Sequence, residues 1–248
     1  MGCRTLTGAL VLGVAAFAAS APAQSISARE AACAPRLAAP LPSDGPGSGR
    51  QLLGGPGPEQ RQLFRNGDAV LLAVGAADGV AVGTQFFTRH RVAPVRVELR
   101  RLGLAVEVTT GWVRAVEVGE TTTIGVVEHT CRELRRGDLL APLEWPADVT
   151  PEPPGQPDFD EPAQVLFGAD GRAMAGAGQF VVIDDGEASG LSPGDRMTVF
   201  RPSPGGPDQP VTVVGEGVVV LVADQSATLQ LLEASRPVRT GDAVGRHR

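Results

Sequence analysis

The sequence has no lysine and no tyrosine, and only 4% of its 248 residues are aromatic. Every basic side chain other than histidine is therefore an arginine. The arginines are scattered along the chain, so we interpret them, with the excess of alanine and glycine, as a bias of the coding sequence rather than as clamps for phosphate or carboxylate groups. The net charge is −6 and no basic stripe is present, which argues against nucleic acid as a partner.

Patterns that carry catalysis or bind metals are missing as well. The sequence has no G-x-S-x-G nucleophile motif, and Gly176 and Gly178 are not followed by a predicted helix, as a phosphate-binding loop requires. His90, His129 and His247 stand alone, without a second ligand at metal-binding spacing. We therefore predict that the chain is not an enzyme and has no catalytic residue, metal site or cofactor.

The acidic turn at residues 184–187 has the negative charge of a calcium-binding loop. It lacks the alternating oxygen ligands and the distal glutamate of such loops, so we interpret it as a solvated turn.

Long apolar runs are absent beyond the N-terminus. The first 23 residues have Arg4 near the start, an apolar core at 6–19 that is short for a membrane span, and small residues before a cleavage point after Ala23. This pattern predicts a secretory signal peptide, with an uncleaved anchor as the alternative. We expect an exported protein of the periplasm or cell envelope, with no membrane span after cleavage.

Two passages of the chain repeat each other. Residues 67–88 (GDAVLLAVGAADGVAVGTQFFT) match residues 178–199 (GQFVVIDDGEASGLSPGDRMTV) at a constant offset of 111. Both copies end alike, in RELRRGDLLAP around Gly137 and in RPVRTGDAVGR around Gly241, where the offset is 104. The first copy therefore carries about seven extra residues, and a duplicated module is predicted.

Each copy consists of short apolar or alternating runs separated by glycine turns, without a convincing amphipathic helix. The predicted strands of the first copy are 69–74, 85–90, 92–99, 111–118, 121–128 and 139–141. Those of the second are 164–167, 180–183, 196–201, 211–214, 217–222, 227–232 and 243–244. The pattern predicts an all-β chain of two tandem small antiparallel β-barrel-like domains.

The glycines suit turns that need a positive φ, and aspartates after glycine suit turns in which the side chain bonds its own backbone. The structural turn residues predicted in this way are Gly79, Gly83, Gly137, Asp138, Gly190, Gly194, Asp195, Gly241 and Asp242.

The domain plan follows from composition. After the signal peptide, 24–62 is a flexible arm rich in proline, glycine and alanine, with one short helical turn near 28–33. The first repeat covers 63–143 and the second 163–248. Between them, 144–162 is a proline-rich linker with six acidic residues and no basic one, expected to be extended and semi-rigid.

Two cysteines, Cys33 and Cys131, remain after loss of the signal peptide. In an oxidising compartment one disulfide is the simplest pairing, and it would tie the arm to the end of the first repeat. The alternative is an exposed Cys33 and a buried Cys131 that acts as a small apolar residue. Two thiols this far apart make a poor zinc site.

Part of the second copy matches a known pattern. It reads G-L-x-x-G-D-x-x-x-V-x-R, then G-x-V-V-x-V and an alanine, then a serine and G-D-x-V. The residues are Gly190, Leu191, Gly194, Asp195, Val199, Arg201, Gly217, Val219, Val220, Val222, Ala227, Ser235, Gly241 and Asp242.

The pattern resembles the small β-barrel at the C-terminus of flagellar assembly protein T, a module that also follows LysM domains in exported bacterial proteins. The resemblance covers about 70 residues of the second copy. The first copy matches more loosely, with Thr84 in place of Asp195 and Cys131 in place of Ser235. It implies a structural or interaction element of the envelope, without catalytic residues. No LysM repeat is visible.

The function predicted from these features is an exported, non-enzymatic envelope protein that acts as a structural or protein-interaction module, flagellar-assembly-like, with an envelope protein of unknown identity as partner. The alternative is binding to cell-wall glycan (peptidoglycan), although glycan sites usually cluster aromatics and the chain has only Trp112 and Trp145. A third hypothesis is an enzyme whose cleft gathers His90 with aspartate and serine side chains from both copies.

Overall fold

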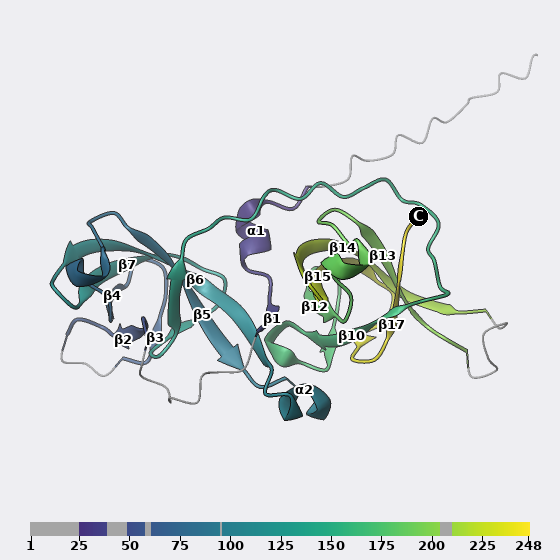
Figure 1. The fold of residues 1–248 in the computed structure, drawn as a ribbon, viewed down its shortest axis with the longest axis horizontal. Coiled ribbons are helices and arrows are strands. Elements are labelled where there is room, and N and C mark those ends of the chain that lie inside the picture. The colour runs from purple at the N-terminus through teal and green to yellow at the C-terminus, as the bar shows by residue number, and fades with distance from the viewer. Residues whose placement is uncertain (1–24, 39–48, 58–60, 95, 204–209) are drawn as a thin grey trace, which may run out of the picture.

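A computed structural model describes residues 25–38, 49–57, 61–94, 96–203 and 210–248 (Figure 1). The predicted signal peptide and much of 39–62 lie outside these residues. Within the described ranges no helix has the length and apolarity needed to cross a membrane.

Most of the described chain is β-structure, as predicted, and it forms two large sheets. The first is an antiparallel sheet of seven strands, ordered β2-β4-β7-β6-β5-β9, with β1 pairing to β6. Its strands are β1 (Arg36–Ala38), β2 (Leu52–Gly54), β4 (Ala69–Leu72), β5 (Gln85–Val92), β6 (Ala105–Val118), β7 (Thr123–Thr130) and β9 (Leu139–Pro142).

The second sheet is a closed antiparallel barrel of six strands, ordered β10-β12-β15-β14-β13-β17. Its strands are β10 (Ala163–Gly168), β12 (Phe180–Ile183), β13 (Arg196–Arg201), β14 (Thr212–Ala223), β15 (Ser226–Ala234) and β17 (Ala243–Arg246). Closure leaves this sheet without a free edge. Its interior is apolar and includes Ile183, Met197, Leu229 and Leu231.

The remaining elements are short. Two-stranded ribbons join β3 (Leu63–Phe64) to β8 (Leu134–Arg135) and β11 (Met174–Ala175) to β16 (Val238–Arg239). The helices are α1 (Ala28–Ala32) and α2 (Val97–Arg101), with 3₁₀ turns η1 (Ala76–Asp78), η2 (Ala169–Gly171) and η3 (Glu187–Ser189).

The sequence repeat is visible in the positions of these elements. β4 and β12, η1 and η3, and β5 and β13 begin 111 residues apart, whereas β8 and β16, and β9 and β17, begin 104 apart. The order β4-β7-β6-β5-β9 of the first sheet matches β12-β15-β14-β13-β17 of the barrel. Register shifts also coincide: the shift at Thr88 in β5 has its counterpart at Val199 in β13. The two sheets therefore follow one plan.

Six turns of the described chain share one hydrogen bond. In each, a glycine with φ between 76° and 106° precedes a residue whose side chain accepts the backbone N–H three positions earlier, at 2.7–3.1 Å. The acceptors are Asp68, Thr84, Asp138, Gln179, Asp195 and Asp242. Thr84 and Gln179 thus do locally what aspartate does elsewhere, which explains why the match between copies is loose in sequence but close in structure.

Two further glycines on the list of turn residues end the 3₁₀ turns. Gly79 follows η1 with φ 80°, and Gly190 follows η3 with φ 78°. Both take the left-handed conformation that glycine adopts without a steric cost.

The arm differs from the flexible segment that its composition suggested. Its described part, 25–38, forms α1, where the short helical turn was predicted, and then β1. Ser27 caps α1 by accepting the N–H of Glu30 at 3.3 Å. Figure 1 shows α1 and β1 between the two large sheets. Ala31 packs in an apolar cluster with Val218 and Val220 of the barrel, whereas Ala32 packs with residues of the first sheet.

A second correction concerns the strand predicted at 92–99. β5 ends at Val92, and the chain turns into α2, where Leu99 is buried with apolar residues of β6 and of the barrel, including Phe167. Val95 lies outside the described residues. The alternation was therefore wrong as extended backbone, and of its apolar face Leu99 is buried whereas Val97 is exposed. Pro94, which has no N–H for a ladder, marks the break. α2 lies in the part of the first copy that has no counterpart in the second copy.

The segment between β9 and β10 contains no helix or strand element. It pairs with the arm through the bridge between Val149 and Ile26. It lies along the barrel through the bridge between Pro157 and His247 and through the Glu152 N–H, which donates to Gly194 O at 2.9 Å.

Candidate functional site

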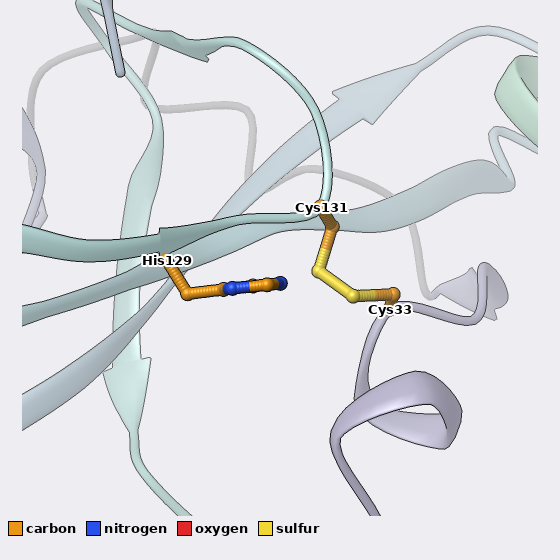
Figure 2. Close-up of side chains that lie close together, drawn as sticks. All are labelled: Cys33, His129 and Cys131. Carbon is orange, nitrogen blue, oxygen red and sulfur yellow. A yellow bond between two sulfur atoms is a disulfide. The ribbon is translucent and has the colours of Figure 1, made fainter. Parts of the chain in front are cut away.

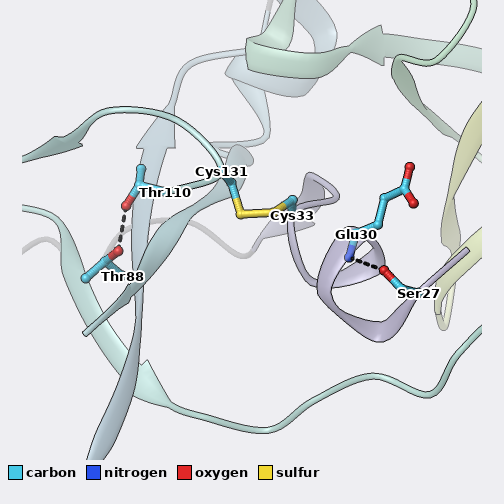
Figure 3. The surroundings of a disulfide bond; sticks show 6 residues. All are labelled: Ser27, Glu30, Cys33, Thr88, Thr110 and Cys131. Atoms are coloured by element: carbon cyan, nitrogen blue, oxygen red, sulfur yellow. Dashed lines mark hydrogen bonds between the residues drawn. A yellow bond between two sulfur atoms is a disulfide. The ribbon is translucent and has the colours of Figure 1, made fainter. Parts of the chain in front are cut away.

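Cys33 and Cys131 are joined by a disulfide whose Cα atoms lie 5.5 Å apart (Figures 2 and 3). Cys33 caps the C-terminus of α1, and Cys131 directly follows β7, 98 residues later. Next to the bond, the Thr110 and Thr88 hydroxyls are hydrogen bonded at 2.8 Å. The disulfide therefore fixes the arm to the end of β7.

His129 completes a close group with the two sulfurs. One ligand atom from each of Cys33, His129 and Cys131 lies within 4.8 Å of the others (Figure 2). Metals bind thiolates, and neither sulfur is a thiolate while the disulfide is intact. The His129 ring instead stacks on Trp112, with centroids 4.2 Å apart and an interplanar angle of 19°. The group is better described as a disulfide beside an aromatic cluster.

The aromatic cluster is built by strand register. Phe87 of β5 pairs with Trp112 of β6, and Trp112 pairs with His129 of β7, so the three side chains stand side by side on one face of the sheet. Trp145, from the segment after β9, packs edge-on against Trp112 at 4.8 Å and against Phe87 at 5.4 Å. Trp112 is 4% exposed and Trp145 is 41% exposed. Both tryptophans of the chain thus meet at one place.

A cleft of about 580 Å³ opens beside this cluster. It is lined from α1, β5, β6, β7 and the segment after β9 by Ala28, Arg29, Gln85, Trp112, Glu128, His129 and Trp145. Its volume lies within the range of small-ligand sites, and its lining is more polar than is usual for them.

Glu128 is the fixed charge of the cleft. Arg114 Nε donates to Glu128 Oε1 at 2.6 Å, and the Gln85 amide donates to Oε2. Partial burial raises the pKa of Glu128, but the hydrogen bonds from Arg114 and Gln85 and the charges of Arg114 and Arg29 lower it by more, so the net pKa lies below the usual 4.5. The carboxyl is therefore anionic at neutral pH.

Arg29 is the complementary charge. It lies exposed on α1 and makes no hydrogen bond or ion pair with any other residue that the structure describes. Because Arg114 already pairs with Glu128, the charge of Arg29 is available to a ligand in the cleft.

The other histidines lie elsewhere. His90 Nδ1 is 2.9 Å from Asp138 Oδ1, and the Thr110 hydroxyl is 2.8 Å from Asp138 Oδ2. The residue of the barrel that matches His90 is Arg201, and Arg201 pairs with Asp242. The same place thus pairs a nitrogen-bearing side chain with a buried carboxylate in both sheets, which is a structural arrangement.

His247 is held in place by two hydrogen bonds. Its Nε2 is 2.7 Å from the Thr198 hydroxyl, and Nδ1 accepts the Gly155 N–H at 3.3 Å. In the acidic turn, Asp184 accepts the Gln164 N–H at 2.6 Å and Asp185 bonds the Gly186 N–H. These carboxylates thus accept backbone N–H groups, one from β10 and one from the turn itself.

Sequence reasoning missed the cleft. It treated Trp112 and Trp145 as single aromatics, and it placed no function on Arg29, Gln85 or Glu128. The alternation of 111–118 did place Trp112 on a strand face, but pairing with Phe87 and His129 depends on register, which alternation does not specify.

Comparison with known proteins gives no relative. A scan against models of protein families finds no match for the chain, and a search of curated proteins also finds none.

Proposed function

We propose that the chain is an exported, non-enzymatic protein of the bacterial cell envelope that acts as a structural or protein-interaction module. The observation that carries the proposal is the arm, which is bonded covalently to the first sheet through Cys33 and packed against the barrel. Disulfides persist in oxidising compartments such as the periplasm, which supports export. The resemblance of the second copy to the flagellar assembly module supports an interaction role.

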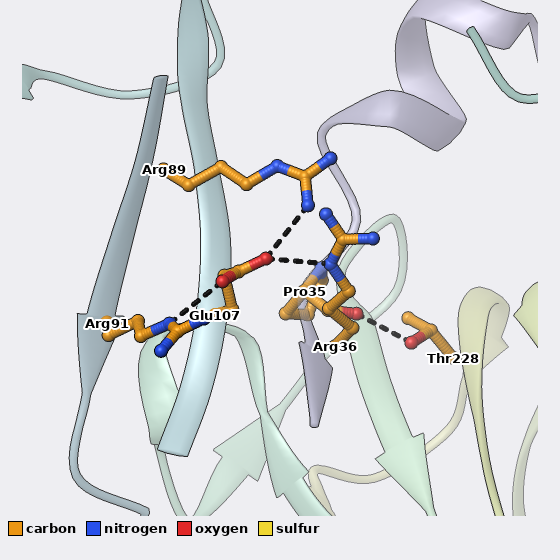
Figure 4. Close-up of polar contacts among 6 residues, drawn as sticks. All are labelled: Pro35, Arg36, Arg89, Arg91, Glu107 and Thr228. Atoms are coloured by element: carbon orange, nitrogen blue, oxygen red, sulfur yellow. Dashed lines mark hydrogen bonds and ion pairs between the residues drawn. The ribbon is translucent and has the colours of Figure 1, made fainter. Parts of the chain in front are cut away.

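The arm holds the first sheet by charge as well as by the disulfide. Glu107 of β6, only 7% exposed, accepts hydrogen bonds at 2.9–3.0 Å from Arg36 of β1 and from Arg89 and Arg91 of β5 (Figure 4). Three charge-assisted hydrogen bonds offset the cost of desolvating this carboxylate and fix its position.

The arm holds the barrel at the same time. The Thr228 hydroxyl of β15 donates to Pro35 O at 2.6 Å, and the Gln230 amide donates to Glu30 (Figure 4 shows the first of these). An apolar cluster with residues of both sheets, including Val106, Phe167 and Val182, adds direct contact. Such a body offers fixed surfaces on both sheets at once, which suits a structural subunit.

The test is cross-linking and mass spectrometry on envelopes that contain the native protein, without reductant. Because the chain has no lysine, amine-reactive reagents are unsuitable, and a reagent that joins carboxylates would use its 28 acidic residues. The expected result is a reproducible set of links to a partner, together with a Cys33–Cys131 peptide.

A matched control is the Cys33→Ser/Cys131→Ser variant, in which the arm is no longer bonded and partner links should weaken. A freely soluble monomer that gives only links within itself, with free thiols, would contradict the proposal.

The alternative, binding to cell-wall glycan, is favoured by the meeting of Trp112 and Trp145 at one cleft. Sedimentation with purified sacculi tests it. Clear depletion of the protein from the supernatant supports glycan binding, and full recovery in the supernatant argues against it.

A further inference from the structure

We propose that the cleft formed by Arg29, Gln85, Glu128, His129 and Trp145 is a binding site for an acidic sugar, a pyranose that carries a carboxylate. The inference goes beyond a structural role, and it stands whether or not the protein has a protein partner. It also gives the glycan alternative a definite place on the chain.

The exposed aromatic surface of the cleft favours a sugar ring as ligand. Trp145 is 41% exposed, yet it is held in place by edge contacts with Trp112 and Phe87. Trp112 is held in turn by the stacked ring of His129. The flat C–H face of a pyranose packs on such a ring, and little side-chain freedom is lost on binding because the ring is already fixed.

The cleft also offers both hydrogen-bond donors and hydrogen-bond acceptors, which favours a ligand with hydroxyl groups. A sugar hydroxyl both donates and accepts, so its site must offer both. Glu128 uses one bond on each oxygen and has acceptor sites left, and Gln85 retains its amide carbonyl and one N–H. An apolar ligand would leave these groups without partners at a cost in free energy.

The charge of Arg29 favours an acidic ligand. Glu128 is neutralised by Arg114 at 2.6 Å, whereas Arg29 has no partner within the described chain. Among the lining residues Arg29 is the one arginine, and it lies at the end of the cleft formed by α1, where Asp148 Oδ1 also accepts the Ala28 N–H at 2.6 Å. A single carboxylate on the sugar complements Arg29, and a charge-assisted bond of this kind is stronger than a neutral one. A polyanion would meet Glu128 and is disfavoured.

Tryptophan fluorescence is a direct probe of the site. The chain has two tryptophans and no tyrosine, and both tryptophans line the cleft. The oxidised mature chain would be titrated with N-acetylmuramic acid and with N-acetylglucosamine, which lacks the lactyl carboxylate. Glucuronic acid and glucose form a second pair that distinguishes a cell-wall source from other acidic sugars.

The expected result is a saturable change in emission, with the acidic member of at least one pair binding about tenfold more tightly than its neutral counterpart. Arg29→Ala should abolish that preference. Glu128→Gln and Gln85→Ala should weaken both members of the pair, and Trp145→Ala should remove binding.

Controls separate loss of the site from loss of the fold. Trp145→Phe keeps an aromatic ring and should retain measurable binding, and Met174→Ala, an exposed residue of β11 on the barrel side, should change nothing. Absence of saturation by all four sugars up to about 10 mM, a range weaker than ordinary small-ligand sites, would overturn the inference. Equal affinity for acidic and neutral sugars, or binding unchanged by Trp145→Ala, would overturn it as well. Partner cross-links that persist in that case leave the interaction role intact.

Discussion

The first sheet and the barrel have the same strand order, but they carry opposite chemistry at matching positions. Where register aligns three aromatic side chains across β5, β6 and β7, the barrel aligns three polar ones across β13, β14 and β15. The first set is Phe87, Trp112 and His129, and the second is Thr198, Glu216 and Glu233. The cleft is thus a property of one copy, added to a shared scaffold.

The two sheets also differ in what holds them together. The barrel closes on itself, whereas the first sheet takes an additional strand, β1, from the arm and a disulfide at Cys131. The residue that matches Cys131 in the barrel is Ser235, whose hydroxyl bonds Val214 O at 3.2 Å. The edge strands β2 and β9 of the first sheet also meet, through the bridge between Gln51 and Leu139, so the arm and its disulfide are additions to the plan that the two sheets share.

Loss of the disulfide should give the largest difference in stability between the first sheet and the barrel. Cys33→Ser/Cys131→Ser is expected to reduce the free energy of unfolding by about 2 to 5 kcal/mol, because a bond that closes a long loop restricts the unfolded chain. Guanidinium unfolding measures the effect. Ser235→Ala, the matched change in the barrel, should cost less than about 1 kcal/mol. Equal losses would show that the copies do not differ in this way.

Substitution of matched glycines should destabilise the first sheet and the barrel to the same extent, because these glycines belong to the plan that the two sheets share. A Cβ at Gly75 would lie 2.3 Å from Glu120 O, and one at Gly186 would lie 2.2 Å from Ala223 O. Gly75→Ala and Gly186→Ala should each cost about 1 to 3 kcal/mol, since backbone must move to relieve the contact. Gly176→Ala, where a Cβ has open space, is the control. Thermal unfolding of the three variants tests the equivalence.

Exchanging the side chains at the matched positions His90 and Arg201 tests a smaller difference. Arg201 makes two bonds to Asp242, at 2.7 and 2.9 Å, and the hydrogen bond with Asp242 raises the pKa of Arg201, whereas His90 makes one bond to Asp138. Arg201→His should cost about 1 to 2 kcal/mol through the lost bidentate pair. His90→Arg should change the free energy of unfolding by less, because arginine already occupies that place in the barrel. A larger loss for His90→Arg than for Arg201→His would contradict this.

The smallest expected effect is a dependence on pH confined to the first sheet. The pKa of Glu128 is lowered in the folded state, so its contribution to stability is fully present above its usual pKa of 4.5 and is lost as the pH falls through the folded value. The difference in unfolding free energy between the wild type and Glu128→Gln should therefore shrink on going from about pH 6 to about pH 2. A difference that stays constant over this range would contradict the depressed pKa.

The repeat made much of the fold predictable. The offsets of 111 and 104 located corresponding strands, and the glycine turns located their ends, because a positive φ and a side-chain bond to the local backbone are decided within four residues. The pair Cys33 and Cys131 followed from the number of cysteines left in the chain. These inferences depend on local chemistry or on counting, not on how strands align.

What was missed depends on contacts between distant segments. The arm is rich in alanine and proline, and nothing local shows that Pro35 accepts a hydrogen bond from Thr228. The same holds for Trp112 and Trp145, which come together through strand register and the path of the segment after β9. At 92–99 local alternation indicated a strand, but the burial of Leu99 against the barrel favoured a helix.

The arm also imposes an order on folding. Its residues are synthesised first, yet Glu30 and Pro35 find their partners in β15, 200 and 193 residues later. Contacts of such separation are slow to form because a long loop must close before they contribute. A shortened chain that ends before β15 would leave the arm undocked on that side, so docking of the arm on the barrel requires that β15 has already been synthesised.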